Sequence, residues 1–205
     1  SLNMADLEEV PAAVGALTAL TRADFSGCYG MGGTLDPLAP LASSLRELHI
    51  NPARITSLSA LTALTALEEL AVEFDGEELR DAGAAPLVEP GPHLSRLRAL
   101  TVHTYCGDAG PVVDVRRRLV EPLRCATALT ALEFVENKGP SAVLLNTDRI
   151  DDLLAGKPAM GRFVFQMEHA LEFDLDLEAL QARHPAVEFE LGGNVWWGSP
   201  LEEDV

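Results

Sequence analysis

The segment LTALEELAV, residues 64–72, decides the fold of this chain of 205 residues. Its apolar side chains lie at relative positions 0, 3, 6 and 8, which are Leu64, Leu67, Leu70 and Val72. The alternation at the end of the segment is typical of a β-strand that buries one face. One such strand cannot bury its leucines alone, so the segment predicts stacked copies that form a parallel sheet.

The same pattern of apolar residues recurs along most of the chain, in places without its first apolar residue. The copies are LTALTRADF (17–25), LRELHI (45–50), LTALEELAV (64–72), LSRLRALTV (94–102), LTALEF (129–134), MGRFVF (160–165) and PAVEFEL (185–191). Their last apolar residues are taken as Phe25, Ile50, Val72, Val102, Phe134, Phe165 and Phe189. The spacings between these positions are 25, 22, 30, 32, 31 and 24 residues, so the repeat is irregular.

This pattern resembles the leucine-rich repeat family, whose signature is LxxLxLxxN or LxxLxLxxC, over roughly residues 10–191. Cys28 and Asn137 match the polar turn position of the signature, and Asp75 is a tolerable substitute. The residues that depart from it are Ala53, Tyr105, Glu168 and Gly192. The resemblance implies an α/β leucine-rich repeat solenoid of about seven repeats. A curved parallel sheet would lie on its concave side, with helices or loops on the convex side.

The segments between the copies are long enough for the crossovers that parallel strands need. Helical spacing of apolar residues predicts a helix around 150–154, and Asp176 is expected to cap a second helix over 177–183. The glycine-rich segment 26–40 and the segment 89–93 are predicted to be loops. The first has no lysine of a phosphate-binding loop, and 34–37 is not expected to begin a helix.

Because the repeat continues on both sides of these loops, residues 1–195 are expected to form one leucine-rich repeat domain. Residues 196–205 are expected to form an acidic tail, with Trp196 or Trp197 packed on the last repeat or anchoring a partner. Three widely spaced cysteines, Cys28, Cys106 and Cys125, fit reduced thiols and a cytoplasmic location.

The charge balance bears on the class of partner. Fifteen Lys and Arg against 32 Asp and Glu give a formal net charge of −17, which disfavours nucleic acid and anionic membrane surfaces. No apolar run reaches the roughly 18–20 residues of a membrane span. Arg116, Arg117, Arg118 and Arg124 form the main basic group. They are interpreted either as an exposed helical surface or as a contact for an acidic partner.

The outward residues of the strands are the candidate binding site, because this family uses its concave surface for partners. The pattern places Asp24, His49, Thr101, Glu133 and Glu188 in one column across the sheet. Glu73, His103 and Glu190 fall in the next column, and Glu69 lies just before the first. This acidic face predicts docking of a basic or polar protein partner. The alternative is an ordinary solvated strand face.

Glu73 and His103 are expected on adjacent strands, with His49 one strand further. A metal site or acid–base pair is one interpretation, and an exposed Glu–His contact is the other. A third ligand is missing, so neither a metal nor a cofactor is expected. The sequence therefore predicts a non-catalytic protein–protein interaction module, alone or within a larger protein or complex. A regulatory or catalytic domain of an enzyme and a purely structural subunit are the alternatives, and the oligomeric state stays open.

Overall fold

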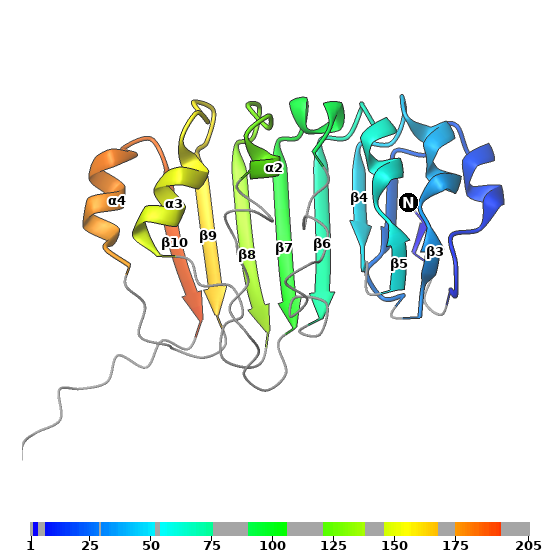
Figure 1. Ribbon diagram of the computed structural model, residues 1–205, viewed down its shortest axis with the longest axis horizontal. Coiled ribbons are helices and arrows are strands. Elements are labelled where there is room, and N and C mark those ends of the chain that lie inside the picture. Colours follow the sequence, from blue (N-terminus) through cyan, green and yellow to red (C-terminus); the bar gives the residue numbers. More distant parts are fainter. Residues whose placement is uncertain are drawn as a thin grey trace, which may run out of the picture.

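The computed structural model describes residues 2–3, 7–28, 30–51, 54–75, 90–105, 121–137, 146–167 and 175–193. Its main feature is an eight-stranded parallel sheet in the order β1-β2-β4-β6-β7-β8-β9-β10 (Figure 1). The strands are β1 (Leu2–Asn3), β2 (Arg22–Phe25), β4 (Glu47–Ile50), β6 (Glu69–Asp75), β7 (Ala99–Tyr105), β8 (Ala131–Asn137), β9 (Arg162–Met167) and β10 (Glu188–Gly193). Each copy of the repeated sequence motif forms one strand, which gives a solenoid-like α/β architecture.

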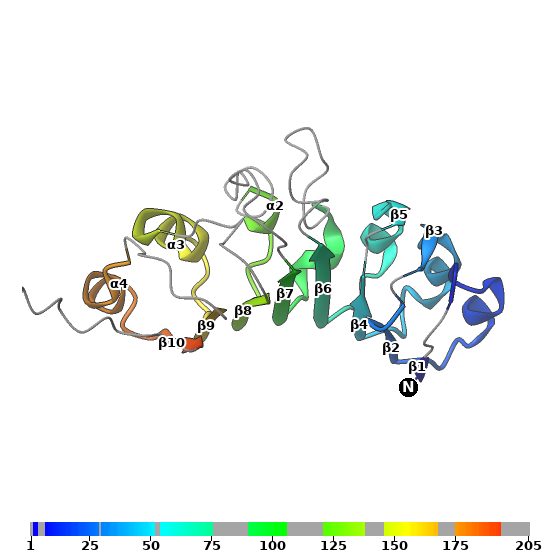
Figure 2. The same ribbon diagram turned by 90° about the horizontal axis from the view of Figure 1, so that it is seen from below.

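Short helices and a second, two-stranded sheet lie on one side of the main sheet (Figure 2). These elements are η1 (Ala12–Ala16), β3 (Gly32–Thr34), η2 (Asp36–Leu41), β5 (Arg54–Ser57), η3 (Ser59–Ala63), η4 (Pro92–Ser95), α2 (Glu121–Leu123), α3 (Thr147–Leu154) and α4 (Leu177–Arg183). Figure 2 shows the sheet as a shallow arc with the helices on its outer side. The open face of the sheet is therefore the concave side, as predicted.

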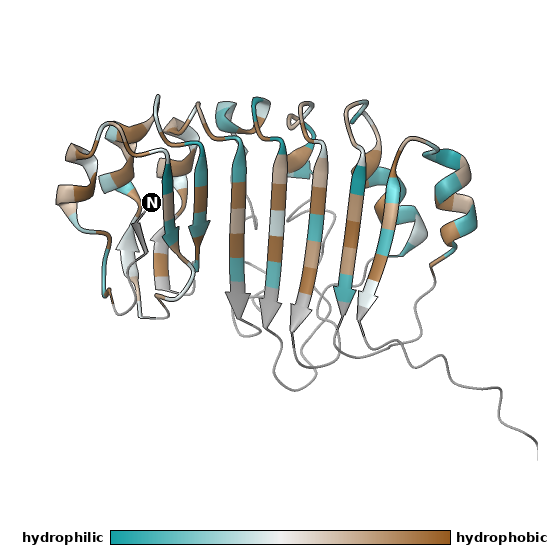
Figure 3. Cartoon of the chain, turned by 180° about the vertical axis from the view of Figure 1, so that it is seen from behind, coloured by the Kyte–Doolittle hydropathy of each residue, from teal (hydrophilic) through white to brown (hydrophobic). Residues whose placement is uncertain are grey.

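The strand register places the repeated apolar residues in two buried rows, visible as bands across the strands in Figure 3. One row holds Ala23, Leu48, Leu70, Leu100, Leu132 and Phe163. The next holds Phe25, Ile50, Val72, Val102, Phe134 and Phe165. All twelve residues are buried, so the stacked strands form one continuous aliphatic and aromatic core.

The register of β10 corrects the sequence prediction for the last copy. Phe189 pairs with Phe163 and Leu191 with Phe165, so Leu191 is the last apolar residue and the final spacing is 191 − 165 = 26. Val187 takes the turn position of Met160, because the Val187 N–H donates to His184 O as the Met160 N–H donates to Lys157 O. This copy has no leucine before Leu191, and its apolar pattern fits either register.

The segment 26–40, predicted to be a loop, contains β3 and the 3-10 helix η2. Leu35, Leu38 and Leu41 are fully buried at a spacing of three, which suits the three residues per turn of a 3-10 helix. Pro37 lies in the first turn, where a missing N–H costs no hydrogen bond. The expectation that no helix begins at 34–37 is therefore wrong, and in 89–93 a 3-10 helix likewise begins at Pro92.

The two helices predicted from apolar spacing and caps are confirmed. In α3 the Asn146 side chain accepts a hydrogen bond from the Arg149 N–H at 3.0 Å. In α4 Asp176 accepts one from the Ala179 N–H at 2.8 Å, as expected from the sequence. Arg124 is exposed after α2. Arg116, Arg117, Arg118, Cys106, both tryptophans and the acidic tail lie outside the described residues.

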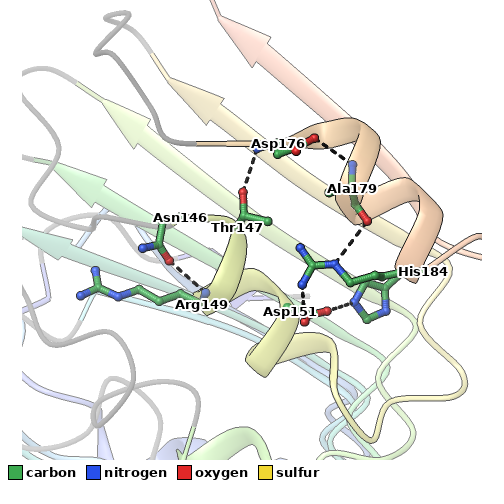
Figure 4. A network of polar contacts seen from close by, with 8 residues as sticks. Asn146, Thr147, Arg149, Asp151, Asp176, Ala179 and His184 are labelled. Carbon is green, nitrogen blue, oxygen red and sulfur yellow. Dashed lines mark hydrogen bonds and ion pairs between the residues drawn. The ribbon is translucent and has the colours of Figure 1, made fainter.

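Polar contacts join α3 to α4 on the outer side (Figure 4). Asp151 accepts a hydrogen bond from Arg183 at 2.7 Å, and its other oxygen lies 2.6 Å from His184 Nε2. The hydrogen bond with His184 is the main reason that the pKa of Asp151 lies below 3.8. The Asp176 N–H donates to Thr147 Oγ1 at 2.7 Å. These contacts connect the last two crossovers.

Asp151→Asn is expected to lower the free energy of unfolding at pH 7 by about 1 kcal/mol or less, because the pair is partly exposed and water screens it. The folded-state pKa of Asp151 is lowered, so its contribution is present above 3.8 and is lost as the pH falls further. Urea unfolding at pH 7 and pH 3 measures both effects. Asp152→Asn, an exposed change on the same helix, is the control. An equal loss in both variants would contradict the assignment.

Candidate functional site

Three rows of outward residues cross the open face of the sheet. The first row is Arg22, Glu47, Glu69, Ala99, Ala131, Arg162 and Glu188. The second is Asp24, His49, Ala71, Thr101, Glu133, Val164 and Glu190. The third includes Glu73, His103, Val135, Gln166 and Gly192. The neighbours predicted on β2 to β8 are confirmed, whereas Glu188 and Glu190 each lie one row away from the predicted column.

The acidic residues at the N-terminal end of the face already have partners. Asp24 accepts hydrogen bonds from the Ser26 N–H at 3.1 Å and from Ser26 Oγ at 2.7 Å. Burial acts to raise the pKa of Asp24, but these hydrogen bonds and the nearby His49 and Arg22 outweigh it, so the pKa is lowered. Glu47 lies 2.9 Å from Arg22 and 3.3 Å from His49 Nε2. Both carboxylates therefore have hydrogen-bond or ion-pair partners within the face, although a single arginine lies beside two acidic residues.

Polar contacts also join residues at the C-terminal end of the face. Glu190 forms an ion pair with Arg162 at 2.7 Å, a contact that the corrected register makes possible. Gln166 Nε2 donates to Glu133 Oε1 at 3.3 Å. Both contacts join neighbouring strands across the face, and an exposed pair of this kind contributes little to stability. Arg162 is the one basic residue among these outward positions, whereas Glu133, Glu188 and Glu190 are acidic, so this end of the face is acidic as well.

A depression of about 510 Å³ occupies the centre of the face, between β2 and β8. Its lining residues are Ser26, Gly27, His49, Ile50, Ala71, Val72, Glu73, Thr101, His103 and Glu133. It brings together five of the nine predicted site residues, and Asp24, Glu69, Glu188 and Glu190 lie outside its lining. Sequence analysis did not select the small or apolar lining residues, because their only signal is their position beside the polar columns.

Glu73 is the exceptional residue of the depression. Its side chain is buried, with 6% of the residue exposed, although it lies on the outward side of β6. Its carboxylate oxygens are not among the buried side-chain atoms of the described residues that lack a hydrogen-bond partner. Glu73 therefore adds an acidic side chain to the central depression, beside Glu133.

His103 lies beside Glu73 on the neighbouring strand. Burial lowers the pKa of His103, and this effect exceeds the opposite influence of Glu73 and Glu133. The imidazole of His103 is therefore mostly neutral at pH 7.

The alternative interpretations of this cluster find no further support. Among the described residues, no group of three or more His, Cys, Asp and Glu side chains is placed to hold a metal ion. Glu73 and His103 are paired positions on neighbouring strands, and no hydrogen bond between them is found in that part of the chain. Cys28 is buried, with 1% of its surface exposed, in the turn after β2.

No protein-family model matches the chain, and a search of curated proteins found no match. In the described segments, every helix is too short or too polar to cross a membrane. Inferences about function therefore rest on the face and its depression.

Proposed function

We propose that this chain is an irregular leucine-rich repeat protein that binds a basic segment of a protein partner on the concave face of its sheet, without catalysing a reaction. The observation that carries the proposal is the central acidic depression, which Glu73 and Glu133 line. The stacking of strands that each contain one copy of the repeated motif supports the assignment to the leucine-rich repeat family. The step from a repeat architecture to partner binding is an analogy with other repeat proteins.

The charges at the centre of the face favour a basic partner. The outward positions of β6, β7 and β8 carry Glu69, Glu73 and Glu133, and they carry no Lys or Arg. Electrostatic complementarity of this kind selects partners and accelerates their encounter. The formal net charge of −17 acts in the same direction by repelling acidic proteins. The free thiol of Cys125 is exposed, which suits a reducing compartment such as the cytoplasm.

Basic peptides are expected to bind the wild-type chain, and acidic peptides of the same length are not. Reversing two charges of the face, Glu69→Lys with Glu133→Lys, should weaken the binding of basic peptides by about tenfold or more, because attraction becomes repulsion. Fluorescence anisotropy with peptides that differ only in their Lys and Arg content measures this effect. The affinity should also fall as salt is added.

The matched control reverses two exposed glutamates on the outer side, Glu121→Lys with Glu178→Lys. It changes the net charge by the same amount and is expected to alter the affinity by less than about twofold, because its charges lie far from the bound peptide. An equal loss of affinity in the control would show that only the overall charge matters. No preference for basic peptides would overturn the proposed function.

A further inference from the structure

A second hollow lies at the edge of the sheet where β6, β7 and β8 begin, at the top of the view in Figure 1. It has a volume of about 260 Å³ and is lined by Glu68, Ser95, Arg96, Arg98 and Ala128. None of these residues belongs to the three outward rows of the concave face or to the lining of the central depression. We call this separate site the rim hollow.

Two guanidinium groups without a partner are the main feature of the rim hollow. Arg96 and Arg98 are exposed, and within the described residues neither side chain makes a hydrogen bond or an ion pair. Acidic residues outnumber Lys and Arg by 32 to 15 in this chain, so arginines can readily find carboxylates. Four others do so, namely Arg22, Arg46, Arg162 and Arg183. The charge of the two arginines is therefore available to a ligand.

The remaining lining residues leave the hollow in need of an anion. The carboxylate of Glu68 already forms an ion pair with Arg46 of the preceding repeat. The hydroxyl of Ser95 donates to Pro92 O at 2.8 Å, so it adds no negative charge. The rim hollow is consequently a positively charged site on a chain whose formal net charge is −17.

Backbone contacts fix the position of Arg98 between two neighbouring repeats. Its N–H donates to Glu68 O at 2.7 Å, and its carbonyl oxygen accepts from the N–H of Thr130 at 2.8 Å and from Thr130 Oγ1 at 2.9 Å. The polypeptide at this point is held on both sides while the guanidinium group stays unpaired. A ligand therefore meets an anchored residue, which lowers the entropy lost on binding.

We propose that the rim hollow binds the phosphate group of a phosphorylated serine or threonine of the partner, with Arg96 and Arg98 as its contacts. This inference rests on the proposed function, because the same partner segment would continue onto the concave face. A phosphate monoester carries a charge of about −1.5 to −2 at pH 7, which two guanidinium groups match. The planar guanidinium also presents paired N–H donors that fit two oxygens of a phosphate.

The charges around the rim hollow favour one phosphate on a basic peptide over a nucleic acid. Glu69, directly beside the lining residue Glu68, begins the acidic outward rows of the face. A nucleic acid would bring further phosphates against these rows and against the net charge of the chain, and both would repel it. A peptide with one phosphate and several arginines suits both the rim hollow and the acidic face.

The spacing of the two sites predicts where the phosphate lies in the peptide. Thr101 lines the central depression and follows Arg98 by three residues along β7. At about 3.3 Å per residue of strand, the two positions are about 10 Å apart. An extended peptide covers this distance with about three residues, so the phosphorylated residue is expected about three residues from the basic segment.

The test compares peptides of alternating arginine and glycine that carry one serine, either three residues before the first arginine or three residues after the last. Each is used unphosphorylated, phosphorylated and with glutamate in place of the serine, and binding is followed by fluorescence anisotropy. Phosphorylation should tighten binding by about tenfold or more in at least one of the two arrangements, and glutamate should tighten it less. Without a site for the phosphate, its negative charge should weaken binding to this acidic chain.

Two double variants locate the contact. Arg96→Gln with Arg98→Gln should remove the gain from phosphorylation, and should leave the melting temperature unchanged because neither side chain makes a described contact. Arg149→Gln with Arg183→Gln removes the same charge from the outer helices α3 and α4 and should retain most of the gain. An equal loss of the gain in both variants would show that only the overall charge matters.

Each result also separates this inference from the proposed function. If the unphosphorylated peptides bind but phosphorylation weakens them, or if the gain survives in the Arg96 and Arg98 variant, the phosphate site is wrong and the proposed function stands. An equal gain from glutamate would overturn the assignment to phosphate. Tighter binding of a double-stranded oligonucleotide than of any phosphopeptide would replace the peptide by a nucleic acid. If no peptide binds, both proposals are wrong.

Discussion

Leu100→Ala is expected to lower the free energy of unfolding by about 2–5 kcal/mol. Leu100 lies in β7 near the middle of the sheet, is 1% exposed and pairs with Leu70 and Leu132 in the buried row. Truncation removes the transfer free energy of the side chain and leaves a cavity that neighbouring strands cannot fill without moving. Chemical denaturation followed by circular dichroism measures the change.

The matched control is the same substitution at the edge of the sheet, Leu191→Ala. Leu191 is 39% exposed on β10, so its truncation should cost about 1 kcal/mol or less. An unchanged unfolding transition in Leu100→Ala, or a larger loss in Leu191→Ala, would contradict the register of the buried rows.

Acidification from pH 7 to pH 4 is expected to destabilise the fold by up to about 3 kcal/mol through one buried histidine. His93 in η4 is 0% exposed, and neither ring nitrogen has a hydrogen-bond partner within the described residues. Burial lowers the pKa of His93 from 6.5 to about 4. Between pH 6.5 and about 4, the His93 imidazole is therefore protonated in the unfolded chain but not in the folded chain. The free energy of unfolding falls over this range as the pH is lowered.

His93→Leu should flatten the stability profile over this range and should leave stability at pH 7 unchanged or higher, because an apolar side chain needs no partner in the buried site. Urea unfolding at several pH values between 7 and 4 measures the slope. His49→Gln, on the open face, should retain the fall that His93 causes. If His93→Leu loses as much stability on acidification as the wild type, His93 is not the responsible group.

The strands were predictable because each copy of the repeated motif has its own alternation of apolar and polar residues. A shift of one residue would turn the leucine row to solvent, so the register from β2 to β9 is strongly determined. In the last copy Phe189 and Leu191 are both apolar and occupy alternate positions, so a shift of two residues costs little in the pattern. Because the predicted register of the last strand was wrong by two residues, the ion pair between Arg162 and Glu190 was not predicted.

Other features depend on contacts between distant segments and were not predictable. Gly32 and Gly33 indicated a loop, but they form β3 by pairing with β5, about twenty residues later in the chain. The outward position of Glu73 was predicted correctly. Its 6% exposure was not predicted, because an alternating pattern assigns a residue to one face of a strand and does not say how much of that face is covered. His93 lay in a segment predicted to be a loop, where burial is not expected.

Mapping the backbone amide shifts of the chain during titration with a peptide of alternating arginine and glycine tests the central claim most directly. The account predicts that the largest shifts lie at the lining of the depression on β4, β6, β7 and β8, with α3 and α4 unaffected. Glu69→Lys with Glu133→Lys should suppress these shifts. Shifts centred on α3 and α4, or distributed evenly over the sheet and the helices, would contradict docking on the concave face.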